Sequence, residues 1–175
     1  ATLIANNELA LLRPEQADIR EVLASNLEEL HRLTGIVNDM LFLSQADRGV
    51  GARRVPVASL ASMAADVLDY HEAALAEADL TAKVVGDAHG AFDVPLLRRA
   101  LSNLLGNATR YAKNGSIVQV TFKPSDGGRV LLSVTNCGDT IDPEILPHLF
   151  DRFFRGDPAR SHGQSNHGLG LAIVG

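Results

Sequence analysis

Residues 97–111, LRRALSNLLGNATRY, are the most informative stretch of this chain. Asn103 and Asn107 stand four residues apart, so both amides lie on one face of the predicted helix, close to the positive Arg110. Leucines anchor the rest of this helix to a core: Leu97, Leu101, Leu104 and Leu105. Magnesium prefers hard oxygen ligands, and a neutral amide oxygen can bind it without repelling phosphates. The stretch predicts a site for magnesium and a nucleotide, while an Asn pair at this spacing is also typical of an exposed polar edge.

A glycine-rich segment, GLGLAIV, follows at residues 168–174. Glycines before a helix allow the backbone to approach phosphate oxygens closely, and the free N–H groups attract an anion. The tetrapeptide GLGL is neither a P-loop nor a complete dinucleotide fingerprint, and such glycines also form ordinary turns. Between the two segments, residues 149–155 read LFDRFFR. Its phenylalanines predict a small packed cluster that holds a loop, with Arg155 as the member that reaches a ligand.

Four motifs therefore occur in order: NLLGNATRY at 103–111, NCGDTID at 136–142, LFDRFFR at 149–155 and GLGLAIV at 168–174. In order and spacing they resemble the N box, first glycine box, F box and second glycine box of the GHKL ATPase superfamily. Within it, they are most similar to the sensor histidine kinases of two-component systems. Residues 25–49, SNLEELHRLTGIVNDMLFLSQADRG, resemble the second helix of the dimerisation and histidine-phosphotransfer hairpin of such kinases, especially those similar to heavy-metal sensors.

This resemblance implies that the chain binds ATP and Mg²⁺. It implies that Asn107 coordinates the metal, that Asn103 and Arg110 contact the phosphates, and that Tyr111 lies along the adenine ring. The implied nucleotide-binding residues are Asn103, Asn107, Arg110, Tyr111, Asn136, Gly138, Ile141, Phe153, Phe154, Arg155, Gly168, Leu169, Gly170 and Leu171. The chain departs from the family pattern at Asn136, which replaces an aspartate and accepts a hydrogen bond more weakly because it is neutral. Thr140 and Asn166 replace glycines of the two glycine boxes.

Apolar residues before the first motif recur by four and three, which is a heptad pattern. The seam consists of Ile19, Leu23, Asn26, Leu30, Leu33, Val37, Met40 and Ser44, and Val22, Leu27, Ile36 and Leu41 widen it. With a helix at 2–12 and a turn at 13–16, this pattern predicts a helical hairpin that pairs with a second copy as a four-helix bundle. The alternative is a helix of a monomer that packs on its own domain.

The chain is expected to be α+β, with the helical hairpin, half of a dimeric bundle, followed by an α/β sandwich of the GHKL (Bergerat) type. We predict the partial hairpin domain at 1–47, a hinge at 48–54 and an ATP-binding domain at 55–175 that stops before its C-terminal end. Strands are predicted at 55–57, 81–85, 117–122 and 130–135, and helices at 58–79 and 94–112. Residues 138–167 are predicted to be a long loop, which is either a lid or disordered.

Composition restricts the partners. A net charge of -5, with 16 basic residues, argues against nucleic acid as a partner. The single cysteine, Cys137, excludes a disulfide framework and is typical of a reducing cytoplasm. Because no apolar run approaches the length of a membrane span, we expect a cytoplasmic fragment. The resemblance implies a parent protein in the bacterial inner membrane, attached through parts that are missing here.

The resemblance also implies a protein histidine kinase that passes the γ-phosphate of ATP to a histidine and then to an aspartate of a response regulator receiver domain. The family's phosphoacceptor box, HE followed by a polar run and a proline, does not occur in the sequence. We therefore predict no catalytic histidine here and no autophosphorylation by this fragment. Two alternatives remain: another GHKL ATPase or anti-sigma kinase, and a dimerisation and docking module with a degenerate nucleotide site.

Overall fold

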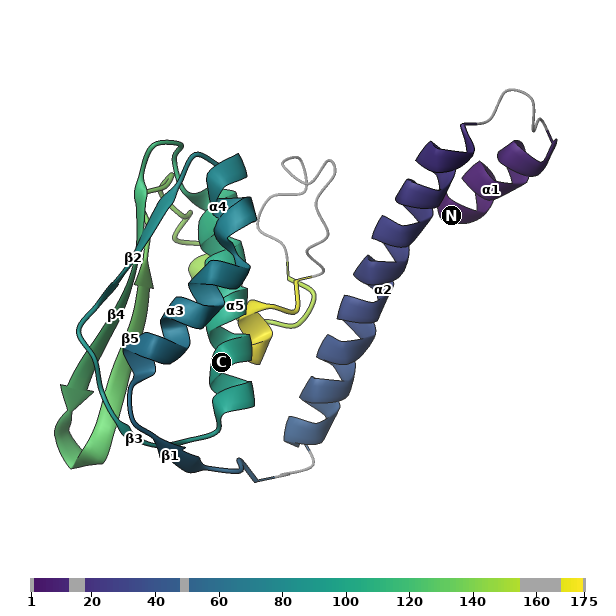
Figure 1. The fold of residues 1–175 in the computed structure, drawn as a ribbon. Helices are drawn as coiled ribbons and strands as arrows, with labels where there is room; N and C mark the ends of the chain where they lie inside the picture. Colours follow the sequence, from purple (N-terminus) through teal and green to yellow (C-terminus); the bar gives the residue numbers. More distant parts are fainter. Residues whose placement is uncertain (1, 13–17, 48–50, 155–167, 175) are drawn as a thin grey trace.

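The computed structural model describes residues 2–12, 18–47, 51–154 and 168–174. Two helices come first, α1 (Thr2–Leu12) and the long α2 (Ile19–Asp47). Strands and helices then mix: β1 (Val55–Val57), α3 (Leu60–Tyr70), α4 (Glu72–Glu77), β2 (Thr81–Val85), β3 (Gly90–Phe92), α5 (Val94–Tyr111), β4 (Ile117–Ser125) and β5 (Arg129–Thr135). Short 3-10 turns lie at η1 (Asp126–Gly128), η2 (Leu146–His148) and η4 (Leu171–Ile173) (Figure 1). Within these described ranges, we find no helix with the length and apolar character that a membrane span requires.

The main sheet has the order β2-β4-β5 and is mixed. β2 runs parallel to β4, with Thr81 opposite Ile117, whereas β4 and β5 form an antiparallel hairpin that extends from Gln119–Thr135 to Ser125–Arg129. A second sheet consists of β1 and β3, paired antiparallel. The sequence analysis did not predict β3, because three residues with one glycine carry too little alternation to be recognised without their partner strand.

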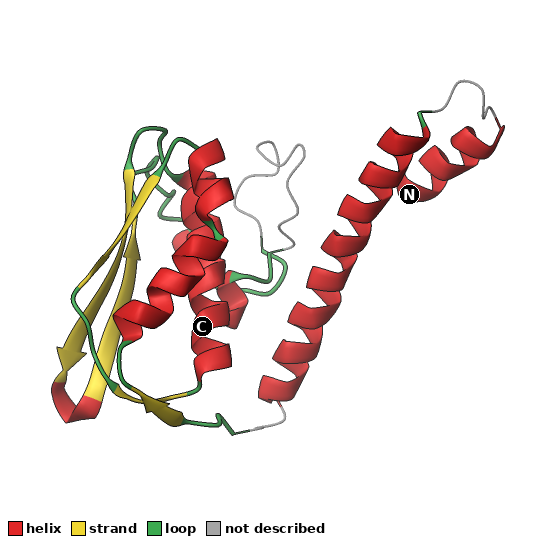
Figure 2. Ribbon diagram, in the orientation of Figure 1, coloured by secondary structure: helices red, strands yellow, loops and turns green. Residues whose placement is uncertain are grey.

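The helices α3, α4 and α5 cover one face of the main sheet (Figure 2). The core lies between the two layers and combines Leu60, Met63, Ala64 and Val67 of α3, Leu101, Leu105 and Ala108 of α5, and Val118, Val120 and Phe122 of β4. Each of these side chains is at most 5% exposed. α5 begins at Asp93, whose carboxylate accepts a hydrogen bond from the Leu96 N–H at 3.1 Å, as helix N-caps commonly do. The predicted arrangement, a long N-terminal helix before an α/β layer pair, is confirmed.

The single helix predicted over residues 58–79 is wrong in one respect, because His71 interrupts it. The backbone of His71 has φ −93° and ψ 1°, so α3 ends there and α4 begins. The imidazole Nε2 of His71 lies 2.7 Å from the Ser102 hydroxyl of α5, and the Tyr70 ring stands edge-on to it. This contact between helices is long-range and cannot be recognised from the pattern of one helix.

The pH dependence of stability is expected to reflect His71. Burial lowers the pKa of this imidazole below its ordinary value of 6.5. The unfolded chain therefore binds the proton more readily, so the stabilisation is present above the unfolded pKa and is lost as the pH falls below it. Unfolding temperatures measured between about pH 7.5 and about pH 5.5 should fall, and the fall should be smaller in His71→Gln. An equal fall in both proteins would show that other groups cause it.

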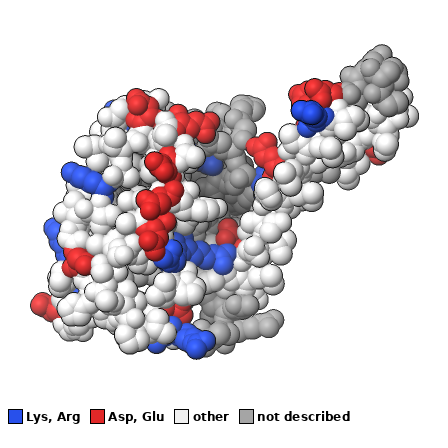
Figure 3. All heavy atoms as spheres, in the orientation of Figure 1, with Lys and Arg blue, Asp and Glu red and all other residues white. Residues whose placement is uncertain are grey.

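α2 carries an apolar face that its own chain covers only in part. Two contacts hold α2 to the rest of the chain: Asn26 exchanges two amide hydrogen bonds with Asn7 of α1, at 2.8 and 2.9 Å, and Leu43 is buried near the C-terminal end. The exposed apolar stripe consists of Leu23, Leu27, Leu30, Leu33, Val37, Met40 and Leu41, each 44% exposed or more. Much of the side of α2 that Figure 3 shows is accordingly white, neither acidic nor basic. Asn26 lies on the same helix face as Leu23 and Leu30, which are three and four residues away, so α1 contacts the N-terminal part of this apolar face.

The C-terminal part of α2 is held against α5 by one arginine. A guanidinium nitrogen of Arg99 lies 2.6 Å from the Asp39 carboxylate, and its central carbon lies 4.4 Å from the ring centroid of Phe42. Both charged side chains are less than 30% exposed, so solvent screens this pair less than a surface pair. The neighbouring pair Arg98–Asp66 is more exposed and joins α5 to α3.

We expect the Arg99–Asp39 pair to couple α2 to α5 measurably. A double-mutant cycle with Arg99→Ala and Asp39→Ala, measured by urea unfolding, should give a coupling energy of about 1 kcal/mol. The matched cycle with Arg98→Ala and Asp66→Ala should give about 0.5 kcal/mol or less because that pair is exposed. Equal coupling in the two cycles would contradict a special role for Arg99.

Candidate functional site

A cavity of about 710 Å³ opens beside the C-terminal half of α5. Its walls come from α5, the end of β5, the loop that follows β5 and the segment that leads into η4. The lining residues are Leu104, Asn107, Ala108, Arg110, Tyr111, Val134, Asn136, Gly138, Asp139, Thr140, Ile141, Asp142, Ile145, Leu149, Phe150, Phe154, Gly168, Gly170 and Leu171. Both this volume and the combination of apolar walls with a few polar groups are typical of a small-molecule or cofactor pocket.

Helical spacing explains the wall that α5 contributes. Leu104, Asn107, Ala108 and Tyr111 follow at intervals of three, one and three residues, so their side chains lie on one stripe of the helix. Ala108 also reaches the core, which keeps this stripe in position. The Asn107 amide is thus the polar group in the middle of an apolar wall, and Arg110 provides a positive charge near the end of the helix.

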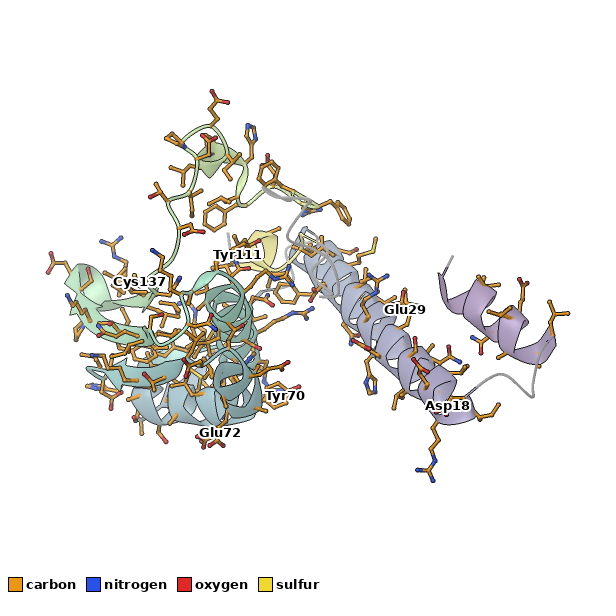
Figure 4. The ribbon with its side chains drawn as sticks, turned by 90° about the horizontal axis from the view of Figure 1, so that it is seen from above. Asp18, Glu29, Tyr70, Glu72, Tyr111 and Cys137 are labelled. Atoms are coloured by element: carbon orange, nitrogen blue, oxygen red, sulfur yellow. The ribbon has the colours of Figure 1, made fainter. Side chains whose placement is uncertain are left out.

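Gly138 brings the loop after β5 against the end of α5. Ala112 and Gly138 form an isolated antiparallel bridge, and the Lys113 N–H donates to the Cys137 carbonyl at 2.8 Å. A Cβ on Gly138 would lie 2.4 Å from the Tyr111 carbonyl oxygen, which is far inside van der Waals contact. Figure 4 labels Tyr111 and Cys137 on these two segments. Only glycine permits this approach, which closes one end of the cavity.

Gly168 lines the cavity from the segment that leads into η4. Its φ is +69°, a conformation that L side chains rarely adopt, and its carbonyl accepts a hydrogen bond from the Phe153 N–H at 2.9 Å. A Cβ there would lie 2.5 Å from the Phe154 carbonyl oxygen. Gly170 differs, because its φ is −58° and a Cβ would meet only the Asn103 side chain, at 3.6 Å or more.

The structure brings ten of the predicted binding residues together around this cavity: Asn107, Arg110, Tyr111, Asn136, Gly138, Ile141, Phe154, Gly168, Gly170 and Leu171. Three others do not line it. Asn103 lies against Gly170, and its buried amide nitrogen makes no hydrogen bond with any described residue. Leu169 is buried at 1% exposure, whereas Phe153 points to solvent at 58%. Arg155 and Asn166 lie outside the described residues.

Sequence reasoning did not assign several residues that line the cavity: Leu104, Ala108, Val134, Asp139, Thr140, Asp142, Ile145, Leu149 and Phe150. For Leu104 and Ala108, helical spacing from Asn107 was a signal that could have found them. The loop residues Ile145, Leu149 and Phe150 had no such signal, because their position depends on how the loop folds back over α5.

The charges around the cavity are unevenly distributed. Arg110 is the only lysine or arginine among the described lining residues, and the carboxylates of Asp139 and Asp142 follow Gly138 in the loop. The N–H groups near Gly168 and Gly170 stand at the start of η4. An anion is therefore better accommodated between Asn107, Arg110 and the glycine segment than beside the two aspartates.

Magnesium and a nucleotide fit these residues. The Asn107 amide offers a hard oxygen ligand for the metal. Gly138 and Gly168 let neighbouring backbone segments come close together, and a Cβ at either position would clash with that backbone. The apolar residues Ala108, Val134 and Ile141 provide surfaces on which a planar ring can pack.

Comparisons with known proteins place the chain among ATPases and sensor kinases. Residues 92–175 match the family described as histidine kinase-, DNA gyrase B- and HSP90-like ATPase. The sensor histidine kinase CusS of Escherichia coli is 43% identical over 174 residues, which are 98% of this chain and 36% of CusS. The chain thus spans about a third of the length of the curated relatives it matches.

Solved structures show the same fold. Histidine kinase AdeS of Acinetobacter baumannii superimposes with a TM-score of 0.80 over 99% of this chain and 79% of that chain, at 20% identity. ShkA, solved at full length in complex with AMPPNP, superimposes with a TM-score of 0.74 over 91% of this chain and 33% of that chain, at 27% identity. With its four motifs, its cavity beside α5 and these relatives, the chain belongs over residues 92–175 to the histidine kinase-, DNA gyrase B- and HSP90-like ATPases and is homologous to sensor histidine kinases.

Proposed function

We propose that the chain is the kinase core of a membrane sensor histidine kinase, which binds Mg-ATP in the cavity beside α5. The observation that carries this proposal is the position of Asn107, which lines the cavity from the apolar wall of α5 together with Arg110 and the glycines Gly168 and Gly170. The relatives are sensor histidine kinases, and one solved neighbour holds AMPPNP. The proposed division is a hairpin domain at 1–47, a hinge at 48–54 and an ATP-binding domain at 55–175.

In this mechanism the chain's own residues mainly bind and orient the nucleotide. Arg110 and the N–H groups around Gly168 and Gly170 would hold the phosphates, and the Asn107 amide oxygen would bind Mg²⁺, which neutralises phosphate charge when bound. The wall of Ala108, Val134 and Ile141 excludes water from one side of the ring. In-line positioning, rather than covalent chemistry by the protein, is what phosphoryl transfer needs.

The acceptor is a histidine outside the motifs of this chain, and the final recipient is an aspartate of a response regulator receiver domain. We propose that two copies pair through the exposed apolar stripe of α2, because single helices rarely leave seven large apolar side chains uncovered. In the parent protein, this core would lie on the cytoplasmic side of the bacterial inner membrane. Sedimentation tests the pairing, since a strict monomer at high concentration contradicts it.

Calorimetric titration of the chain with ATP in the presence of Mg²⁺ tests the proposed site. We expect saturable binding of one nucleotide per chain. No binding would instead favour a degenerate module that only dimerises and docks. A longer protein that includes the acceptor box then tests transfer: incubation with labelled ATP should give acid-labile, base-stable phosphate on histidine, and its absence despite ATP binding would favour another ATPase of the superfamily.

A further inference from the structure

The cavity has two chemically different ends along α5. Gly170 lies against Asn103, and Gly138 lies against Tyr111, eight residues further along the helix. At a rise of 1.5 Å per residue, these two ends are roughly 12 Å apart, which suits a nucleotide lying along the helix. The N–H groups at the start of η4 favour phosphates at the Gly168–Gly170 end, and the carboxylate of Asp142 disfavours them beside Gly138. Arg110, one residue before Tyr111, would extend along α5 to hold them there. The base of a bound nucleotide then lies at the end of the cavity where Gly138 meets Tyr111.

Asn136 is the neutral polar side chain at that base end. It follows β5 directly, lines the cavity and is partly buried. Its amide nitrogen lies 3.3 Å from the position that a Cβ on Gly138 would take, so it stands beside the point where the loop closes. No hydrogen bond joins its side chain to any other residue in the described part of the chain. Nothing in those residues therefore fixes which way the amide points.

An amide with this freedom can recognise either purine. Its oxygen accepts a hydrogen bond, its nitrogen donates one, and rotation by half a turn exchanges the two. Adenine carries an amino group at position 6, which donates, and guanine carries an oxygen there, which accepts. A carboxylate at the same position could only accept and would face the guanine oxygen with no proton between them.

We propose that Asn136 makes this cavity accept guanine nucleotides as well as adenine nucleotides. This inference rests on the proposed function, since it concerns the base of the nucleotide bound there. The carboxylates of Asp139 and Asp142, which lie near the same end of the cavity, are not expected to select between adenine and guanine. One oxygen of Asp142 accepts the Glu144 N–H at 2.9 Å, and both Asp139 and Asp142 are exposed to water, where a hydrogen bond discriminates little.

The experiment compares Mg-ATP and Mg-GTP by calorimetric titration of the chain. The two dissociation constants should agree within roughly threefold, because either orientation of the amide makes one neutral hydrogen bond. In Asn136→Asp, ATP should bind at least roughly tenfold more tightly than GTP, since a carboxylate leaves the guanine oxygen unpaired. Asn114→Asp makes the same substitution at an exposed position outside the cavity and is the matched control, with an unchanged ratio.

Each result decides one point. A preference for ATP of more than about tenfold in the unaltered chain would overturn the inference and leave the proposed function intact. If neither nucleotide binds, the proposed function fails as well. Should Asn136→Asp fail to fold, as shown by its circular dichroism, Asn136→Ala replaces it: the affinities for both nucleotides should then fall by the same factor. A fall for ATP alone would show that the amide selects adenine.

Discussion

Replacing Gly168 with alanine is expected to abolish nucleotide binding, whereas the same change at Gly170 is expected to preserve it. Gly168 has φ +69°, and a new Cβ would lie 2.5 Å from the Phe154 carbonyl oxygen and 2.6 Å from the Phe153 carbonyl carbon. Both atoms belong to backbone and cannot rotate away. The strained backbone alone costs about 1–3 kcal/mol, and relief of the contact must displace residues 168–171 from the wall of the cavity.

Gly170 provides the matched control because it lies in the same motif and cavity. Its φ of −58° suits alanine, and a Cβ would make ordinary contact with Asn103 at 3.6–3.7 Å. Titration of both variants with Mg-ATP should show no binding for Gly168→Ala and a dissociation constant within about threefold of the parent for Gly170→Ala. An equal loss of ATP affinity in both variants would mean that the segment needs two flexible glycines, and that the positive φ of Gly168 is not the reason for the effect.

Replacing Asn107 with alanine is expected to remove the dependence of nucleotide affinity on magnesium. In the proposed site, this amide supplies the protein's oxygen ligand to the ion, and it lies in the middle of the α5 wall. Loss of even an outer-shell partner of a metal lowers affinity by about 10- to 100-fold, so loss of the direct ligand should lower Mg-ATP affinity by at least that factor. Affinity for ATP in EDTA should change little.

The neighbouring Gly106→Ala variant is the control for this measurement. Gly106 lies in the same helix, does not line the cavity, and a Cβ there would meet nothing within 4 Å. Alanine should stabilise the helix by about 1 kcal/mol and leave the effect of magnesium unchanged. If Asn107→Ala binds Mg-ATP as tightly as the parent, the amide is not the metal ligand and the proposed site is wrong at its central residue.

Much of the fold followed from local patterns. The heptad at residues 19–44 predicted α2, and alternation predicted β4 and β5, because these elements bury one face against a layer and repeat with the period of their backbone. β4 and β5 were each predicted shorter than they are, since the pairs at Pro124–Val130 and Ser125–Arg129 extend the hairpin beyond the alternating residues. The break at His71 and the strand β3 depended on partners distant in sequence, Ser102 and β1.

The candidate site divides in the same way. Short motifs identified Asn107, Gly138 and Gly168, because each motif contains the chemistry it uses within a few residues. The sequence alone thus determined the class of fold, the long amphipathic helix and the principal residues of the proposed site. Only the tertiary structure decided that Asn103 packs against Gly170 rather than lining the cavity, that Arg99 ties α2 to α5, and that one face of α2 stays uncovered. The physical reason is that these outcomes depend on which surfaces meet across long separations, and a local period determines a face but does not identify its partner.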